Sequence, residues 1–186
     1  MRQFPYFLLF ISLLTGCQRN SFTIEGTTEG LNEGDTLFLV RDINTGFPSD
    51  TMIVGEETFS LKGVTDSALL GFIYAQKDPE ISTTLFLEPG TIEIHLTDSL
   101  QKTIIGGTAA NNALQEANYI AYRYGEKMKE IANLLSNNPI DSTSVLLAKS
   151  QLNRLKKDMT KRIKGIAERN ADNAFGKLIN NNLEED

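Results

Sequence analysis

The spacing of apolar residues changes once along this 186-residue chain, at Gly106-Gly107, and that change divides the fold into two parts. Before the two glycines, apolar and polar residues alternate in short runs separated by turn residues, which is the pattern of half-buried strands. After them, apolar residues recur every three or four positions, which is the pattern of one helix face. The sequence therefore predicts an α+β fold, with a β domain over 22–106 and a helical region over 107–183.

The β domain is expected to contain about eight strands, at the roughly 8–12-residue spacing typical of an antiparallel sandwich or barrel. Gly26 is expected to lie just beyond a short first strand, and Gly55-Glu56-Glu57 is expected to close a hairpin between the third and fourth strands. Glu88-Pro89-Gly90 predicts a turn in which Gly90 takes a positive φ. The predicted strands are 22–24, 36–40, 51–54, 59–61, 69–75, 83–87, 91–96 and 102–105.

The helical region is predicted to be an antiparallel hairpin followed by a short third helix. Thr108 is the expected N-cap of the first helix, and Asn137-Asn138-Pro139 is expected to end it. Asp141 can cap the second helix, and so short a connection makes the two helices antiparallel. Asp172 or Asn170 is expected to cap the third helix, ahead of an acidic tail at 184–186. The two apolar stripes are Ala110, Leu114, Ala117, Ala121, Tyr124, Met128, Ile131 and Leu135, then Val145, Ala148, Leu152, Leu155, Met159, Ile163 and Ile166.

The N-terminus has the features of a bacterial signal peptide. Residues 4–14 are apolar apart from Ser12, and Arg2 supplies a positive charge before them. Such a run makes about 16 Å of helix, which is half of a ~30 Å hydrocarbon core and too short for a permanent span. The run closes on Leu14-Thr15-Gly16-Cys17, which resembles a lipobox. We expect residues 1–16 to be removed between Gly16 and Cys17; an ordinary secretory peptide with an incidental Cys17 is the alternative.

In the lipobox interpretation, Cys17 carries diacylglycerol on its sulfur and a further acyl chain, such as palmitate, on its amine. Residues 17–21 then form an acylated N-terminus and a short tether. Cys17 is the only cysteine, so disulfides and cysteine-bound metals are excluded. Without Arg2 the chain has 17 basic and 24 acidic residues, a net charge of −7, which gives no general attraction for nucleic acid or for anionic lipid headgroups.

The residues after Cys17 bear on the membrane in which the chain is held. Gln18, Arg19 and Asn20 lack an aspartate retention signal and an acidic surface-export run. We therefore expect a lipid-anchored cell-envelope protein at the outer membrane, facing the periplasm.

Three further stretches resemble a known family. They are Phe22-Thr-Ile-Glu-Gly26, Phe86-Leu-Glu-Pro-Gly-Thr-Ile-Glu-Ile94 and Gly107-Thr-Ala-Ala-Asn111. They are similar to a domain of unknown function, family 4369, which occurs in envelope lipoproteins, often N-terminal to a thioredoxin-like domain of the TlpA-type disulfide oxidoreductases. A helical segment lies between those two domains, and residues 170–176 are similar to its closing stretch.

The resemblance has limits that bear on chemistry. The chain ends about where the thioredoxin-like domain would begin, and it contains no Cys-x-x-Cys pair. Oxidoreductase activity therefore does not carry over. An accessory or partner of a thioredoxin-like thiol–disulfide system is the alternative function that the resemblance implies.

Two groups of residues are weak candidates for chemistry. His95 is the only histidine and shares the polar face of its strand with Glu93. The two residues suggest a general base or a zinc ligand, but a zinc site needs three or four protein ligands. A histidine that simply faces solvent explains the pattern as well. Asp42, Asn44 and Gly46 are spaced somewhat like the start of a calcium loop, although Asx turns explain them as well. A third and weaker hypothesis for the function is a hydrolase that uses Glu93, His95 and aspartates of the loops.

The predicted helices carry two further groups of residues that could form contact surfaces. Arg154, Lys157, Lys161 and Lys164 lie on one face of the second helix, either as a phosphate or headgroup patch or as a solvated face. Tyr119 and Tyr122 lie off the first stripe and belong to a partner surface or pack on the β domain.

With no assembled catalytic set and no implied cofactor or metal, we expect a non-catalytic binding or interaction module. A lined pocket in the β domain would favour a ligand, and an exposed apolar stripe on the helices would favour a partner.

Overall fold

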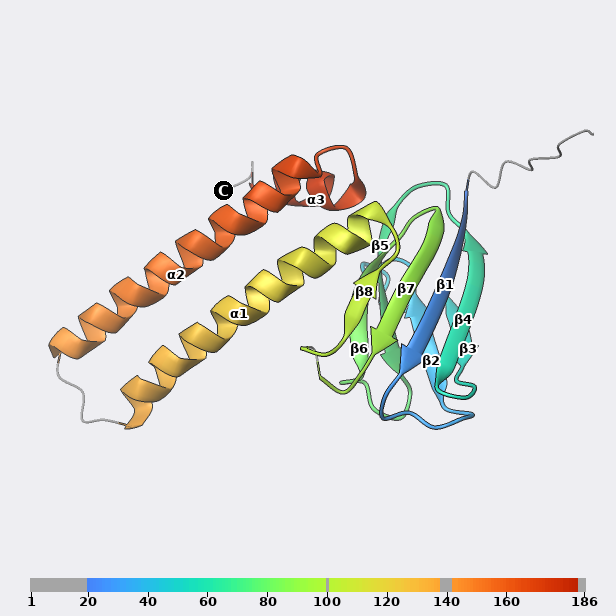
Figure 1. Cartoon of the computed structure of the whole chain (residues 1–186), viewed down its shortest axis with the longest axis horizontal. Helices are drawn as coiled ribbons and strands as arrows, with labels where there is room; N and C mark the ends of the chain where they lie inside the picture. Colours follow the sequence, from blue (N-terminus) through green and yellow to red (C-terminus); the bar gives the residue numbers. More distant parts are fainter. Residues whose placement is uncertain (1–19, 100, 138–141, 184–186) are drawn as a thin grey trace, which may run out of the picture.

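The computed structural model describes residues 20–99, 101–137 and 142–183, and within them eight strands in two sheets precede three helices (Figure 1). The α+β prediction is confirmed. The strands are β1 (Ser21–Thr28), β2 (Thr36–Val40), β3 (Asp50–Ile53), β4 (Thr58–Val64), β5 (Leu69–Ala75), β6 (Ser82–Leu87), β7 (Gly90–Leu96) and β8 (Ile104–Gly106). The helices are α1 (Ala109–Asn137), α2 (Ser142–Arg169) and α3 (Ala174–Leu183).

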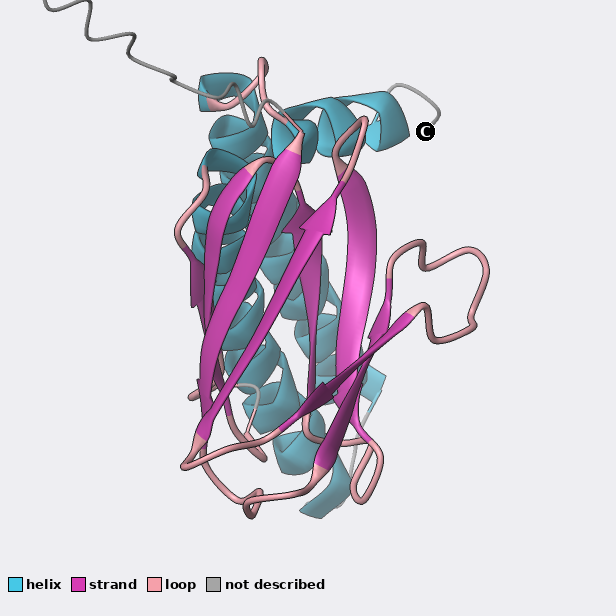
Figure 2. Ribbon diagram, turned by 90° about the vertical axis from the view of Figure 1, so that its right-hand side faces the viewer, coloured by secondary structure: helices cyan, strands magenta, loops and turns pink. Residues whose placement is uncertain are grey.

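The strands form two four-stranded sheets that share one core. Sheet A has the order β4-β1-β7-β8 and sheet B the order β3-β2-β5-β6, and Figure 2 shows them in front of the helices. Side chains from both sheets, such as Ile24 and Ile92 from sheet A and Leu39 and Leu85 from sheet B, are fully buried in the same cluster. The described strands therefore form a sandwich. The alternative of a closed barrel, which the sequence pattern also allowed, is wrong.

One strand pair departs from the predicted antiparallel arrangement. β1 and β7 are parallel, with Ile24 opposite Ile92 and Thr27 opposite His95, whereas every other strand pair in the two sheets is antiparallel. A parallel pair needs a long connection, and here it consists of five intervening strands. No local pattern in β1 or β7 indicates that arrangement, so the prediction of a wholly antiparallel β domain is wrong at this pair.

The predicted hairpin between the third and fourth strands is also wrong. The turn exists, because the Gly55 N–H donates to the Thr58 carbonyl at 2.8 Å. However, β3 pairs with β2 in sheet B, while β4 pairs with β1 in sheet A. The turn therefore carries the chain from one sheet to the other. The physical reason is that each strand finds its partner elsewhere in the chain, with Met52 opposite Leu37 and Leu61 opposite Ile24.

Gly26 does not end the first strand, which continues to Thr28. Its α-carbon faces the core, where the ring of Phe59 from β4 lies directly over it. Gly63 of β4 stands in the same relation to the ring of Phe22 in β1. Each strand therefore supplies one aromatic ring that covers a glycine of the other, which accounts for two glycines within regular strands.

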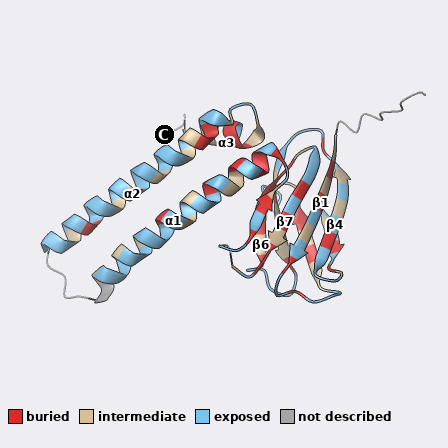
Figure 3. Cartoon of the chain, in the orientation of Figure 1, coloured by how far each residue is buried: buried red, intermediate tan, exposed pale blue. Residues whose placement is uncertain are grey.

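The three helices pack as the hairpin prediction requires, and a second apolar cluster joins them to sheet B. This cluster contains Phe86 of β6, the start of α1, the end of α2 and Phe175 of α3. Along the hairpin, the Arg169 guanidinium pairs with Glu116 at 2.8 Å. Figure 3 shows that buried residues gather in the sandwich and at this junction, while the far end of the hairpin is mostly exposed.

The third helix is capped by a residue other than those predicted. The Asn173 side-chain oxygen accepts the Gly176 N–H at 3.0 Å, which makes Asn173 the N-cap instead of Asp172 or Asn170. Asn170 has a different role, because its amide donates to the Ile166 carbonyl at the end of α2. Among the described helices, none has the length and apolarity needed to cross a bilayer.

Candidate functional site

Two of the three family-like stretches, 86–94 and 107–111, meet at the junction between the sandwich and α1, where a buried amide joins them, and the third, 22–26, pairs with residues 90–94. The Asn111 side chain accepts the Phe86 N–H at 2.8 Å and donates to the Phe86 carbonyl at 2.8 Å. The same amide nitrogen donates to the Thr108 hydroxyl at 2.8 Å. Asn111 is fully buried, so its side chain takes the place of a neighbouring strand on the edge of β6.

The first turn of α1 is also held by the loop between β6 and β7. Glu88 accepts the Ala110 N–H at 2.9 Å, and its carboxylate lies at the positive end of the helix dipole. Thr108, the predicted N-cap, precedes the helix as expected, but its hydroxyl bonds to Asn111. Sequence reasoning missed the part that Glu88 plays, because no local spacing joins position 88 to position 110. The predicted turn is confirmed by the φ of +127° at Gly90.

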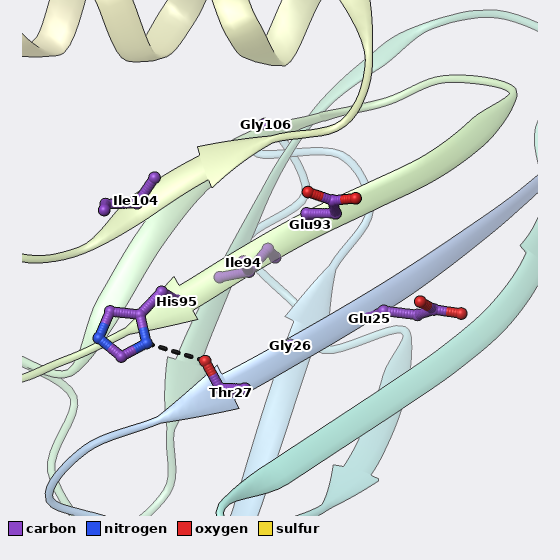
Figure 4. Close-up of a pocket in the computed structure, with 8 residues that line it drawn as sticks. All are labelled: Glu25, Gly26, Thr27, Glu93, Ile94, His95, Ile104 and Gly106. Carbon is purple, nitrogen blue, oxygen red and sulfur yellow. Dashed lines mark hydrogen bonds between the residues drawn. The ribbon is translucent and has the colours of Figure 1, made fainter.

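A shallow hollow lies on the outer face of sheet A, where β1, β7 and β8 run side by side (Figure 4). It has a volume of about 380 Å³ and is open to solvent. Glu25 and Glu93 are directly opposite each other across β1 and β7, as are Thr27 and His95. Gly106, opposite Glu93 on β8, also lines the hollow.

His95 lies on the outer face of the sheet, on the polar side that the sequence predicted. Its Nδ1 is 2.8 Å from the Thr27 hydroxyl, and its Nε2 is 3.5 Å from a carboxylate oxygen of Glu29. Hydroxyl, imidazole and carboxylate thus stand in the order of a nucleophilic triad. However, the amides of Thr28 and Glu29 donate to the carbonyls of Glu57 and Leu96, at 2.9 Å each, so neither can hold an oxyanion.

The other weak candidates are distributed over the molecule. Glu93 lines the hollow beside His95, whereas Asp42 and Asn44 lie in the β2–β3 loop of the opposite sheet and do not line it. Asp42 Oδ1 accepts both the backbone N–H and the side-chain amide of Asn44, each at 2.9 Å, which is the Asx turn that the sequence offered as an explanation. No group of three or more potential metal ligands occurs in the part of the chain that the structure describes. Gly16 and Cys17, the predicted cleavage and lipidation residues, lie outside the described residues.

Outside the sandwich, the described apolar side chains that are both large and exposed lie on the helical hairpin. Leu134 near the end of α1 and Leu146 and Leu147 near the start of α2 are 65%, 68% and 60% exposed, and we call these three residues the leucine tip. Tyr119 is also exposed, and its hydroxyl accepts a hydrogen bond from Arg123 of the same helix at 3.2 Å. The partner-surface alternative therefore fits Tyr119 better than packing on the β domain.

The middle of the hairpin is tied by one polar cluster. The Tyr124 hydroxyl donates to Asp158 Oδ2, and the Arg162 Nε donates to the same oxygen at 3.1 Å. The bond from Tyr124, followed by that from Arg162, lowers the pKa of Asp158. The same bond to the carboxylate raises the pKa of Tyr124, because ionised Tyr124 could no longer donate.

Comparison with known proteins gives one family match. The model of a domain of unknown function, DUF4369, matches residues 22–114, which is half of the chain. No curated protein and no solved structure matches. The matched segment covers the eight described strands apart from Ser21 and ends three residues after Asn111, so it comprises the sandwich together with the first residues of α1. The chain therefore belongs to the DUF4369 family of domains of unknown function.

Proposed function

We propose that this protein is a lipid-anchored, non-catalytic interaction module of the cell envelope, held at the outer membrane and facing the periplasm. The anchoring rests on Leu14-Thr15-Gly16-Cys17 and the short apolar run before it. The interaction role rests on the leucine tip, because three large apolar side chains that remain more than half exposed at one end of a long hairpin are typical of a contact surface. The open hollow on sheet A encloses a ligand far less than an ordinary binding pocket does.

The anchor is tested by mass spectrometry of the N-terminal peptide from membranes. We expect it to begin at Cys17 and to carry acyl chains. Cys17→Ser should leave the precursor uncut, because a hydroxyl does not replace the thiolate as nucleophile toward the lipid donor. A peptide that begins elsewhere, or a free thiol at Cys17, would show that the chain is not anchored in this way.

The interaction role is tested by crosslinking in intact cells. A photoreactive side chain at Leu147 should crosslink to an envelope component, and the same group at Phe47, a 78% exposed residue of the β2–β3 loop, should not. Equal labelling from both positions would contradict a specific role for the tip. Capture of a thioredoxin-like protein from Leu147 would instead assign the chain to thiol–disulfide redox.

The non-catalytic part of the proposal has its own test. His95→Ala removes the imidazole between Thr27 and Glu29 without touching the core, since the side chain lies on the outer face of sheet A. We expect the variant to complement a deletion strain as fully as the wild-type protein does. Loss of function in a folded, correctly localised His95→Ala protein would point to chemistry in the hollow.

A further inference from the structure

Charge is divided between the two parts of this molecule. Residues 21–106 contain 14 acidic and 4 basic residues, a net charge of −10, whereas residues 107–183 contain 7 acidic and 12 basic residues, a net charge of +5. The net charge of −6 for the whole chain conceals this separation. A helical part of opposite sign to the rest of the protein is therefore suited to contact an anionic surface.

The positive charge is concentrated on the outward face of α2. Arg154, Lys157, Lys161 and Lys164, which we call the basic row, follow one another at spacings of three, four and three residues and are all exposed. The apolar stripe of α2 packs against α1, and Figure 1 shows α1 between α2 and the sandwich. The basic row thus lies along the outside of the molecule over about 15 Å. None of the four forms an ion pair with another described residue.

Leu146 and Leu147 of the leucine tip continue the same face toward the start of α2. Leu147 precedes Arg154 by seven residues, slightly less than two helical turns, so both lie on nearly the same line along the helix. At a bilayer surface, acyl chains lie beneath phosphate groups, so exposed leucines can contact the acyl chains while the neighbouring cations contact the phosphates. An acidic protein surface would complement the cations and would leave the leucines unexplained.

The proposed anchor brings a bilayer within reach of this face. Ser21, the first residue of β1, is four residues from Cys17, so the connecting chain spans about 14 Å at most. In both Figure 1 and Figure 2, the start of β1 and the turn from α2 into α3 lie on the upper side of the molecule, whereas Figure 1 shows the start of α2 at the lower left, away from both. A membrane that holds Cys17 would therefore lie near the end of α2 that carries Lys164.

We propose that the leucine tip and the basic row dock on the surface of an anionic phospholipid bilayer, so that the anchored protein is held there by its N-terminus and by α2. The proposal rests on the proposed function for its setting and names the component that the hairpin contacts. Each cation near an anionic leaflet contributes about a fivefold factor in binding. Removal of three lysines should therefore lower the ratio of docked to undocked protein roughly 100-fold.

The test uses the full chain, reconstituted into vesicles through its own N-terminus. Leu147→Cys receives an environment-sensitive fluorophore, and the signal of identically treated chain without this substitution is subtracted. We expect emission to rise and shift to the blue in vesicles of phosphatidylcholine with phosphatidylglycerol, but not in phosphatidylcholine alone. High salt should reverse the change, because the basic row is exposed. The same fluorophore at Phe47→Cys should report no change.

Charge variants make the test specific. Lys157→Gln, Lys161→Gln and Lys164→Gln together should abolish the response, while Lys62→Gln, Lys77→Gln and Lys102→Gln together change the net charge equally and should preserve it. An identical signal in neutral and anionic vesicles, or a response that survives loss of the basic row, would overturn the proposal. Emission that depends on protein density and not on lipid charge would show that the face contacts a second copy or another protein. Labelling of a free Cys17 thiol would contradict the anchor alone.

Discussion

The ring of Phe59 occupies the space that a side chain at Gly26 would need, because a Cβ built on Gly26 would lie 2.2 Å from the Phe59 Cζ. Gly26→Ala should therefore destabilise the sandwich by about 1–3 kcal/mol through overpacking. In a Phe59→Ala background the same substitution should cost far less, since the ring is gone. A double-mutant cycle by urea unfolding should give a coupling energy of about 1–3 kcal/mol.

Gly55 supplies the control for this cycle. Its φ is not positive, and the nearest atoms to a Cβ are 3.7 Å away, so Gly55→Ala should be close to neutral. Additive effects of Gly26→Ala and Phe59→Ala would show that the ring does not set the requirement for glycine at position 26.

A second prediction compares two glycines with similar backbone conformations. Gly107 and Gly46 have φ values of +84° and +67°, so alanine at either position costs about 1–2 kcal/mol of backbone strain. A Cβ on Gly107 would also lie 2.3 Å from the Thr91 carbonyl oxygen, whereas nothing lies within 4 Å of one on Gly46. Gly107→Ala should therefore cost at least about 2 kcal/mol more than Gly46→Ala in thermal or urea unfolding. Equal losses of stability in the two variants would mean that β7 shifts to accommodate the added Cβ at no cost.

The third prediction concerns the buried amide at the junction. Asn111→Ala removes the partners of both the Phe86 N–H and the Phe86 carbonyl, and it should cost about 3 kcal/mol or more. Asn112→Ala, at the adjacent exposed position, should stay within about 0.5 kcal/mol of wild type. Hydrogen exchange should show faster exchange of the Phe86 amide in Asn111→Ala. Unchanged protection of that amide would indicate that water or another group replaces Asn111.

The fourth prediction concerns pH. The Tyr124 hydroxyl is the main cause of the lowered pKa of Asp158, so Tyr124→Phe should raise that pKa toward its ordinary value. A lowered folded-state pKa stabilises the fold above the unfolded pKa, and this stabilisation is lost as the pH falls through the folded value. Tyr124→Phe should therefore flatten the dependence of stability on pH between those two values. Titration of the Asp158 carboxyl by NMR measures the shift directly, and Tyr119→Phe, which removes only the contact with Arg123, serves as the control.

The order and type of the elements could be predicted because they depend on local spacing. Alternation in 91–96 and the three-to-four repeat after Gly107 each reflect which face of one element is buried. The pairing of strands could not be predicted in the same way. The partner of β4 is β1 and not the adjacent β3, and only the packed core distinguishes these alternatives.

The candidate site shows the same division between local and long-range information. The Asx turn at Asp42 and the outward direction of His95 follow from neighbouring residues, and both were predictable. Glu88, Asn111 and the facing carboxylates of Glu25 and Glu93 acquire their partners only when distant segments meet. The exposure of Leu146 and Leu147 likewise depends on how α2 lies against α1.

The parallel pairing of β1 with β7 also sets an order of events during folding. Thr27 and His95, which face each other across this pair, are 68 residues apart. β1 can pair with β4 first, but its other edge stays open until residue 96 has left the ribosome. The sandwich should therefore close slowly, whereas the α1–α2 hairpin relies on contacts between neighbouring elements. In that interval, any other free strand edge competes for the position that β7 finally takes.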